Sequence, residues 1–209
     1  MLVKKVLEEL IKGKAAGPSP EFTVFHLIKA LKLISQGPIG RGKLSKKLGT
    51  GEGTSRTLIE RLKDAQLIAS SKEGCFLTEE GKKLWKKIET VFPKKVKLQE
   101  NELTLTPHNI AILIKDCANK VQTGMKQRDA AIVVGAKGAT TLIMKKDTLT
   151  MPAVSENVAE DFPEAYHQIV GLLKPEENDV VIVASADSLE KAEYGAFAAG
   201  WSLLEENCN

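Results

Sequence analysis

The stretch Gly37–Lys87 constrains the fold most, because its elements follow one another in a characteristic order. Two leucines four positions apart in a basic segment predict a short helix over Arg41–Leu48. Gly49–Gly51 predicts a tight turn, since glycine tolerates the positive φ angles that such turns need. A second helix is predicted over Glu52–Gln66, because its apolar residues recur on one side at helical spacing.

Two short strands are predicted after the second helix. Leu67–Ala69 and Cys75–Thr78 are largely apolar and lie on either side of the polar turn Ser71–Gly74, which is typical of a β-hairpin. The order of short helix, turn, helix and two-stranded ribbon is that of a winged helix-turn-helix. In such a unit the second helix enters the DNA major groove, and the ribbon flanks it.

Further helices are predicted around this unit. Leu2–Lys12 is amphipathic and lies outside the minimal unit, where it either covers the core or pairs with a second copy of the chain. Thr23–Gln36 is the first core helix, with Thr23 as its N-cap. Glu79–Val91 forms a helix that Phe92–Lys95 ends.

Charge divides the chain near residue 93. Residues 1–95 hold 20 Lys and Arg against 10 Asp and Glu, and residues 96–209 hold 10 against 17. We therefore predict two domains, 1–93 and 94–209. Nucleic acid is expected to bind only the basic half, because an acidic surface repels phosphate.

Composition argues against several classes of protein. Apolar runs are too short to span a bilayer, and the N-terminus lacks a signal-peptide pattern, so a cytoplasmic protein without membrane contact is expected. The cysteines and histidines are scattered and show neither a CxxC pair nor metal-ligand spacing. They are Cys75, Cys117, Cys208, His26, His108 and His167. No metal, cofactor or catalytic residue is predicted.

Strands and helices alternate irregularly in the second half. Ile110–Ile114 and Asp179–Ala184 are continuously apolar, as strands buried on both faces are. Val96–Leu105 alternates weakly and predicts a small hairpin. A second hairpin is predicted over Ala139–Met151, with its turn at Lys146 and Asp147.

Three helices are predicted among these strands. Ala130–Val134 has strand propensity, but its polar lead and the following Gly135 favour a helix with a glycine cap. Phe162–Leu173 follows a loop at 152–161, and Asp187 is expected to cap the last helix. The order ββαββ(α)βα predicts a two-layer α+β domain. The predicted fold class is therefore an N-terminal winged helix-turn-helix plus a C-terminal two-layer α+β domain.

Several segments resemble known families. GEGTSRTLIERLKDAQLI resembles the recognition helix of bacterial and archaeal winged-helix regulators, and TSRTLIERL is similar to GntR-type repressors. LTEEGKKLW resembles the step from wing to last helix. With GMKQRDAAIVVGAKGATTL and DVVIVASADSLEKAEYGA, the chain resembles an archaeal winged-helix family. That family's C-terminal domain has no settled function and is similar to the GAD domain of bacterial aspartyl-tRNA synthetases. This implies an architecture and an archaeal source, but no reaction.

Candidate DNA contacts lie on the two helices and the ribbon. Arg56, in the groove-entering part of the second helix, can hold O6 and N7 of guanine with both ends of its guanidinium. Hydroxyl groups beside it suit phosphates and base edges, and the lysines suit phosphates. The predicted contacts are Lys43, Lys46, Lys47, Thr54, Ser55, Arg56, Thr57, Arg61 and Lys72. The alternative, a merely solvated face, is disfavoured by the ten excess positive charges.

A small-anion site is predicted in the second half. Lys120, Lys126 and Arg128 cluster after a buried strand, and Asp129 could accept a hydrogen bond from a ligand hydroxyl. The N-terminus of a helix over residues 125–134 would add partial positive charge. The alternative is an ordinary surface loop.

The predicted function is a DNA-binding transcriptional regulator. Its expected partners are double-stranded DNA, a small anionic effector and a second copy of the chain. The small-residue face Ala192, Ala196 and Ala199 offers one surface for such a homodimer. Two alternatives remain: an RNA- or translation-linked accessory protein, and an enzyme that uses Arg128 and Asp129. A binding protein without catalytic activity is favoured.

Overall fold

The computed structural model describes residues 2–12 and 21–204, which form two compact units. Unit 1 extends to Glu89 and unit 2 begins at Thr90, whereas the boundary predicted from the sequence is residue 93. Cys208 lies outside the described residues. Within the described part of the chain, none of the helices combines the length and the apolar character needed to cross a membrane.

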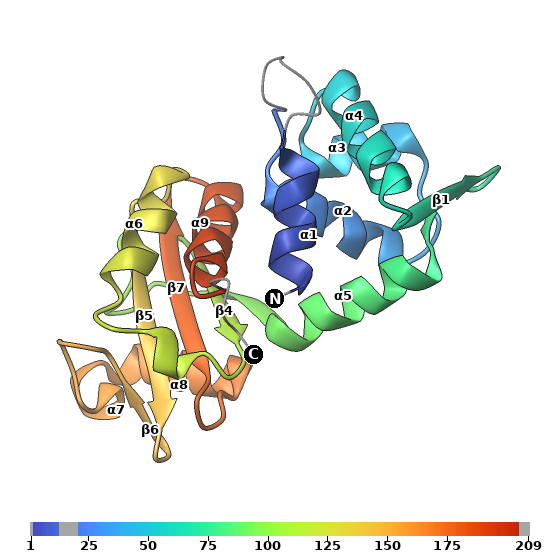
Figure 1. Ribbon diagram of the computed structural model, residues 1–209. Helices are drawn as coiled ribbons and strands as arrows, with labels where there is room; N and C mark the ends of the chain where they lie inside the picture. The colour runs from blue at the N-terminus through green and yellow to red at the C-terminus, as the bar shows by residue number, and fades with distance from the viewer. Residues whose placement is uncertain (1, 13–20, 205–209) are drawn as a thin grey trace. The chain divides into compact units, whose positions relative to one another are not determined.

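Unit 1 is mainly helical and contains a two-stranded ribbon before its last helix (Figure 1). Its elements are α1 (Leu2–Ile11), α2 (Val24–Ser35), α3 (Arg41–Leu48), α4 (Glu52–Asp64), β1 (Ile68–Ser71), β2 (Gly74–Leu77) and α5 (Glu79–Val91), which runs across the division. The strands are antiparallel, with Ile68 opposite Leu77. The predicted helices and the hairpin are thus confirmed as elements. Their core includes leucines from α2, α3 and α4 whose side chains are fully buried.

Two glycines of unit 1 stand where another residue would be strained. Gly49 ends α3 with φ of 72°, which confirms the predicted turn between α3 and α4. Gly74 has φ of 130°, and a Cβ on it would lie 2.4 Å from the main-chain carbon of Ile39. Ile39 and Cys75 exchange two main-chain hydrogen bonds of 3.0 and 2.9 Å, so the close approach ties the ribbon to the segment before α3.

Unit 2 is an α+β unit built on one five-stranded antiparallel sheet. Its elements are β3 (Lys94–Leu98), β4 (His108–Ile114), the short 3₁₀ helix η1 (Ala118–Lys120), α6 (Met125–Val133), β5 (Gly138–Lys145), β6 (Thr148–Thr150), α7 (Val158–Asp161), α8 (Pro163–Leu173), β7 (Val180–Ala186) and α9 (Leu189–Trp201). The strand order is β3-β4-β7-β5-β6, with β7 at the centre. The predicted strands at β4 and β7, the hairpin β5–β6 and the helix α6 are confirmed.

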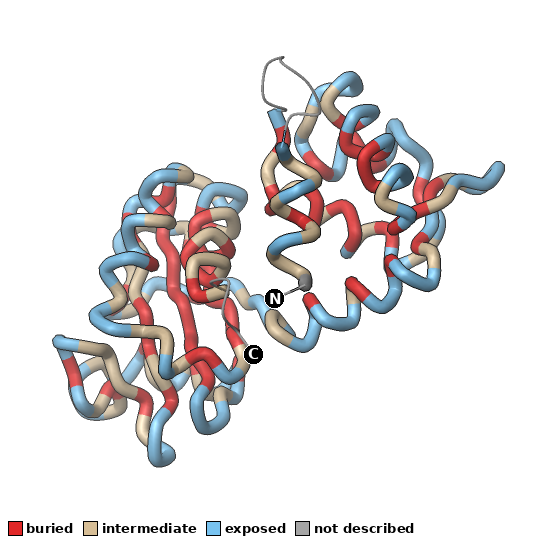
Figure 2. The backbone as a smooth tube through the Cα atoms, in the orientation of Figure 1, coloured by how far each residue is buried: buried red, intermediate tan, exposed pale blue. Residues whose placement is uncertain are grey.

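Helices cover both faces of this sheet, so the prediction of two layers is wrong. On one face α6 and α9 pack against Ile182 and Ala184, and on the other α7 and α8 pack against Val181 and Val183. Every residue of β7 is buried, as the uninterrupted red of this strand in Figure 2 shows. A strand buried on both sides needs a cover on both sides, which makes three layers.

Three local predictions for unit 2 are also corrected. No hairpin forms over Val96–Leu105, because β3 pairs with β4 instead, and Asn101 and Thr104 hold the connection as a turn. The predicted loop at 152–161 contains the short helix α7. The N-cap of α9 is Ser188, whose Oγ accepts the N–H of Lys191 at 3.3 Å.

The small-residue face of α9 lies inside unit 2. Ala192, Ala196 and Ala199 are fully buried and belong to the core between α9 and the sheet. Their small size lets α9 approach the strands and α6 closely. They are therefore not a surface on which two copies of the chain could meet.

Candidate nucleic-acid interface and anion site

The outward face of α3 carries only positive charge. Leu44, Ser45 and Leu48 turn inward, and the four cations of the helix are exposed. These are Arg41, Lys43, Lys46 and Lys47. None of them forms an ion pair with another described residue. This face can therefore bind phosphate groups without first breaking an internal ion pair.

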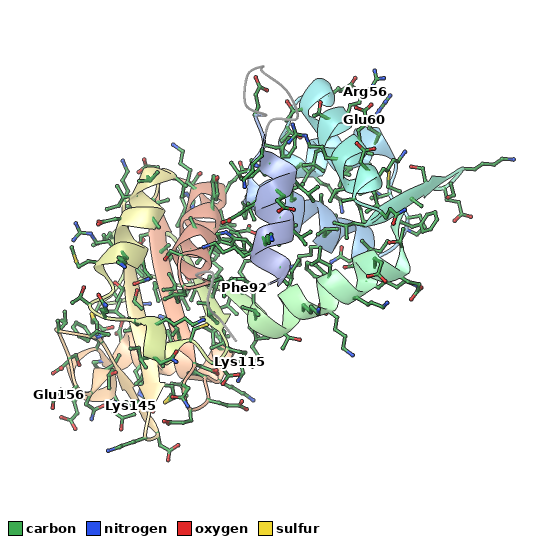
Figure 3. The ribbon with its side chains drawn as sticks, viewed as in Figure 1. Arg56, Glu60, Phe92, Lys115, Lys145 and Glu156 are labelled. Atoms are coloured by element: carbon green, nitrogen blue, oxygen red, sulfur yellow. The ribbon has the colours of Figure 1, made fainter. Side chains whose placement is uncertain are left out.

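The outward face of α4 carries mixed charge. Arg56 and Glu60 are exposed, with relative side-chain exposures of 68% and 57%, and Nε of Arg56 lies 3.0 Å from Oε1 of Glu60. Figure 3 labels both side chains on this helix. Thr57 is also exposed, and its Oγ1 donates to the main-chain oxygen of Gly53 at 3.2 Å. Arg56 and Thr57 are thus available at the surface, but Arg56 has an acidic partner.

Thr54 and Lys72 lie at the margins of this surface. Oγ1 of Thr54 donates to Oε2 of Glu21 at 2.9 Å, so its hydroxyl is engaged within unit 1. Lys72 is exposed in the turn of the β1–β2 ribbon, next to the exposed Glu73. Lys72 therefore remains a candidate phosphate contact at the tip of the ribbon.

Ser55 has a structural role, which corrects its prediction as a DNA contact. Its side chain is fully buried, and its Oγ lies 2.6 Å from Oγ1 of Thr50. Oγ of Ser45 donates in turn to the main-chain oxygen of Thr50 at 2.7 Å. These hydroxyls hold the turn between α3 and α4, and so fix the relative position of the two helices.

Arg61 also has a structural role rather than the predicted contact with DNA backbone. Its side chain is buried, and Nη1 donates to the main-chain oxygens of Leu10 at 2.6 Å and of Lys12 at 2.7 Å. The guanidinium carbon lies 5.4 Å from the centre of the Phe22 ring. Arg61 therefore attaches the end of α1 to α4, and α1, whose Leu7 is fully buried, covers the core, which is one of the two positions predicted for it.

The predicted anion-binding residues of unit 2 do not converge on one site. Lys126 and Arg128 are both exposed on α6, but two helical positions place them roughly 200° apart around the axis. Nε of Arg128 lies 3.9 Å from Oδ1 of Asp129. Lys120 is half-buried on η1, near the buried Cys117. Burial raises the pKa of the Cys117 thiol, and the positive charge of Lys120 opposes that rise.

A separate pocket of unit 2 lies beside the β5–β6 hairpin. Its volume is about 800 Å³, and its lining comes from the segment between Lys145 and Glu156. Figure 3 labels both of these residues at the end of unit 2 that holds the hairpin. None of the predicted ligand residues lines this pocket, so it offers them no common binding cavity.

The comparisons with known proteins agree with the division into two units. Residues 23–92 match a model of the CggR N-terminal DNA binding domain, and residues 105–203 match a domain of unknown function, DUF4443. The first match spans α2 to α5 and leaves α1 outside.

One solved structure is similar over nearly the whole chain. It is a hypothetical protein from Pyrococcus horikoshii OT3, 28% identical, with a TM-score of 0.70. The likeness covers 90% of this chain and 96% of that one. A search of curated proteins finds no match. The chain is thus similar to a DNA-binding domain in its first part and to an uncharacterised domain in its second.

Proposed function

We propose that unit 1 is a winged helix-turn-helix that binds double-stranded DNA, and that the protein is a transcription regulator. The observation that carries this proposal is the cationic face of α3, which precedes a helix with exposed donors. The match of residues 23–92 to the CggR N-terminal DNA binding domain supports it. In this arrangement α4 enters the major groove and the β1–β2 ribbon flanks it.

The exposed side chains divide into two roles. Lys43, Lys46 and Lys47 on α3 contact phosphates and supply affinity, since each neutralised phosphate releases bound counterions. Arg56 on α4 contacts base edges and supplies sequence preference. Lys72 reaches a phosphate from the ribbon. Ser55 and Arg61 position the helices and do not touch DNA.

Unit 2 takes the regulatory part in this proposal. An acidic domain repels the DNA backbone, so in this proposal it does not contact DNA; it either senses a small anionic effector at a locally positive site or pairs two copies of the chain. A homodimer would place two copies of α4 on half-sites about one helical turn of DNA apart. The resemblance of this unit to the GAD domain remains a prediction.

Fluorescence anisotropy with the full chain tests the DNA proposal. Binding sites selected from random duplexes should bind tightly, and the logarithm of affinity should fall linearly with the logarithm of salt concentration. Lys46→Ala should weaken all duplexes alike and reduce the salt slope by about 0.9. Lys97→Ala, an exposed lysine of unit 2, is the matched control and should change neither quantity.

Arg56→Ala provides the second half of the test. It should reduce discrimination between the selected site and random duplex by about 1–3 kcal/mol. A uniform loss of affinity would make Arg56 a phosphate contact only. If the full chain binds no duplex at low salt, the regulator proposal is wrong, and tighter binding to structured RNA would favour the translation-linked alternative.

A further inference from the structure

The N-terminus of α6 has hydrogen-bond donors without acceptors. Gly124 precedes the helix with φ of 78° and offers no capping side chain. The N–H of Met125 lies 3.4 Å from Oγ1 of Thr123. The main-chain N–H groups of Lys126 and Gln127 have no acceptor among the described residues. Such groups carry the partial positive charge of the helix end and attract anions.

A buried hydroxyl points at the same place. Thr141, on β5, is only 4% exposed, and its Oγ1 has no hydrogen-bond partner in the described structure. A Cβ on Gly124 would lie 3.2 Å from this Oγ1, so the hydroxyl lies beside the residue that precedes α6. Burying a hydroxyl without a partner costs stability, and an acceptor atom bound here would remove that cost.

Two lysines accompany these donors. Lys126 is the second residue of α6, and helical side chains lean toward the N-terminus of their helix. Lys120 ends η1, shortly before α6 begins. Neither forms an ion pair with a described residue. The start of α6 and the segment shortly before it thus each carry a lysine without an ion pair in an otherwise acidic unit.

The α8 helix shows how this chain satisfies the same kind of helix end with an oxyanion. The carboxylate of Glu102 accepts the main-chain N–H of Glu164 at 3.0 Å and that of Ala165 at 2.9 Å. These are the second and third residues of α8, as Lys126 and Gln127 are of α6. At α6 no side chain of the described residues accepts a hydrogen bond from the main-chain N–H of Lys126 or Gln127.

We propose that the N-terminus of α6 binds an oxyanion, the phosphate or carboxylate group of a small ligand. The donors are Oγ1 of Thr141 and the main-chain N–H groups of Lys126 and Gln127, and Lys120 adds positive charge. Binding at this site stands apart from DNA binding, and only its use as an effector site rests on the proposed regulator. The site retains two of the four residues expected from the sequence and adds Thr141.

Thermal unfolding of the full chain in inorganic phosphate tests this site, with NaCl keeping the ionic strength constant. Phosphate should raise the melting temperature of unit 2 in a saturable way, because a ligand that binds only the folded state stabilises it. Thr141→Val should weaken the phosphate response about tenfold or more, since one donor to a charged group is lost. Without phosphate, this variant should melt at or above the wild-type temperature, because an unpartnered buried hydroxyl is removed.

Thr140→Val is the matched control, because Thr140 is the neighbour of Thr141 on β5 and faces the opposite side of the sheet. Its phosphate response should equal that of the wild type. Thr141→Ser, which keeps the hydroxyl, should retain the response and serves if the valine variant does not fold. Parallel titrations with acetate show whether carboxylates bind as phosphate does.

The proposal is overturned if millimolar phosphate gives no saturable shift, or if Thr141→Val responds like the wild type. A stabilised Thr141→Val with an unchanged response would mean that the buried hydroxyl is unpartnered but does not bind the anion. DNA affinity is measured on the same preparations. If the chain binds DNA but shows no phosphate response, only this anion site is refuted. If it responds to phosphate but binds no DNA, only the regulator proposal is refuted.

Discussion

Replacing Arg61 by methionine should destabilise unit 1 without removing a DNA contact. Methionine keeps an unbranched apolar stem and loses the guanidinium. Arg61 is 9% exposed and donates from Nη1 to two main-chain oxygens, at 2.6 Å to Leu10 and at 2.7 Å to Lys12. The substitution leaves both carbonyl groups without this donor.

The magnitude follows from the position of these carbonyls at the end of α1. The last carbonyls of a helix have no partner within the helix, and a positive charge beside them is favourable. A hydrogen bond to a charged group contributes about 1.5–3 kcal/mol, and the cation over the Phe22 ring adds about 0.5–1 kcal/mol. These contributions are not additive, because water reaches the freed carbonyls. We expect the free energy of unfolding of unit 1 to fall by about 3 kcal/mol.

Urea denaturation followed by tryptophan fluorescence measures this change. The chain has two tryptophans, Trp85 in unit 1 and Trp201 in unit 2, so a Trp201→Phe background reports unit 1 alone. The midpoint should fall with an unchanged m value. Arg56→Met is the control, because the exposed pair of Arg56 with Glu60 contributes only about 0.3–0.5 kcal/mol.

The opposite pattern would refute the structural role of Arg61. If Arg61→Met leaves the midpoint unchanged and weakens DNA binding as much as Lys46→Ala, the guanidinium contacts phosphate. The buried position would then be incorrect. If instead stability falls and the affinity of the folded protein is unchanged, α1 is held to α4 through this side chain.

Two further predictions concern single residues of either unit. Gly81→Ala in α5 should destabilise unit 1 by about 3 kcal/mol in the same urea assay, because the added Cβ would lie 1.9 Å from the main-chain oxygen of Leu67. Gly53→Ala in α4 is the control: open space surrounds Gly53, so this substitution should stabilise unit 1 by about 0.5–1 kcal/mol. Burial raises the pKa of the Glu102 carboxyl, but main-chain N–H groups, including those at the N-terminus of α8, lower it by more, so that it lies below the ordinary 4.5. The stabilisation from this carboxylate is therefore present above pH 4.5 and lost as the pH falls through the lowered pKa. In Glu102→Gln, the melting temperature of unit 2 should consequently fall less steeply with decreasing pH in this acidic range.

The elements of unit 1 were predictable because their signals are local. The glycines after α3 require a turn, and Gly49 adopts the left-handed conformation that this prediction implies. The leucines of α4 recur at helical spacing, and those at 58 and 62 are fully buried. Such patterns lie within a few residues, so they do not depend on the rest of the fold.

The roles of Ser55 and Arg61 were only partly readable from the sequence. Each lies three positions from Leu58, which places both on the apolar side of α4. That spacing was a signal against a DNA contact. Their partners were not predictable, because Leu10 is 51 residues from Arg61 and is brought near only by the packing of α1.

The layers of unit 2 and the residues of the proposed anion site depend on distant contacts. The continuous apolar run of β7 did indicate burial on both faces, and three layers follow directly from it. The sequence did not indicate a role for Thr141, because threonine is common in strands and its role depends on which segment packs against it. The contact with Gly124 joins residues in different elements, and only the folded chain shows it.

Under the proposed function, the distribution of charge in unit 1 predicts that affinity for DNA and sequence preference come from different helices. All charged side chains of α3 are positive, whereas α4 carries Glu52, Glu60 and Asp64 against Arg56, Arg61 and Lys63, and Arg61 is buried. A helix whose exposed charge is net negative gains little from phosphates alone. In a groove, Arg56 must exchange Glu60 for another acceptor, and a guanine edge provides two. On a non-specific duplex the Glu60 carboxylate lies near phosphate, and Arg56 gains no guanine edge in exchange for Glu60. Under the proposed function α4 therefore opposes non-specific binding, while α3 supports binding to every duplex.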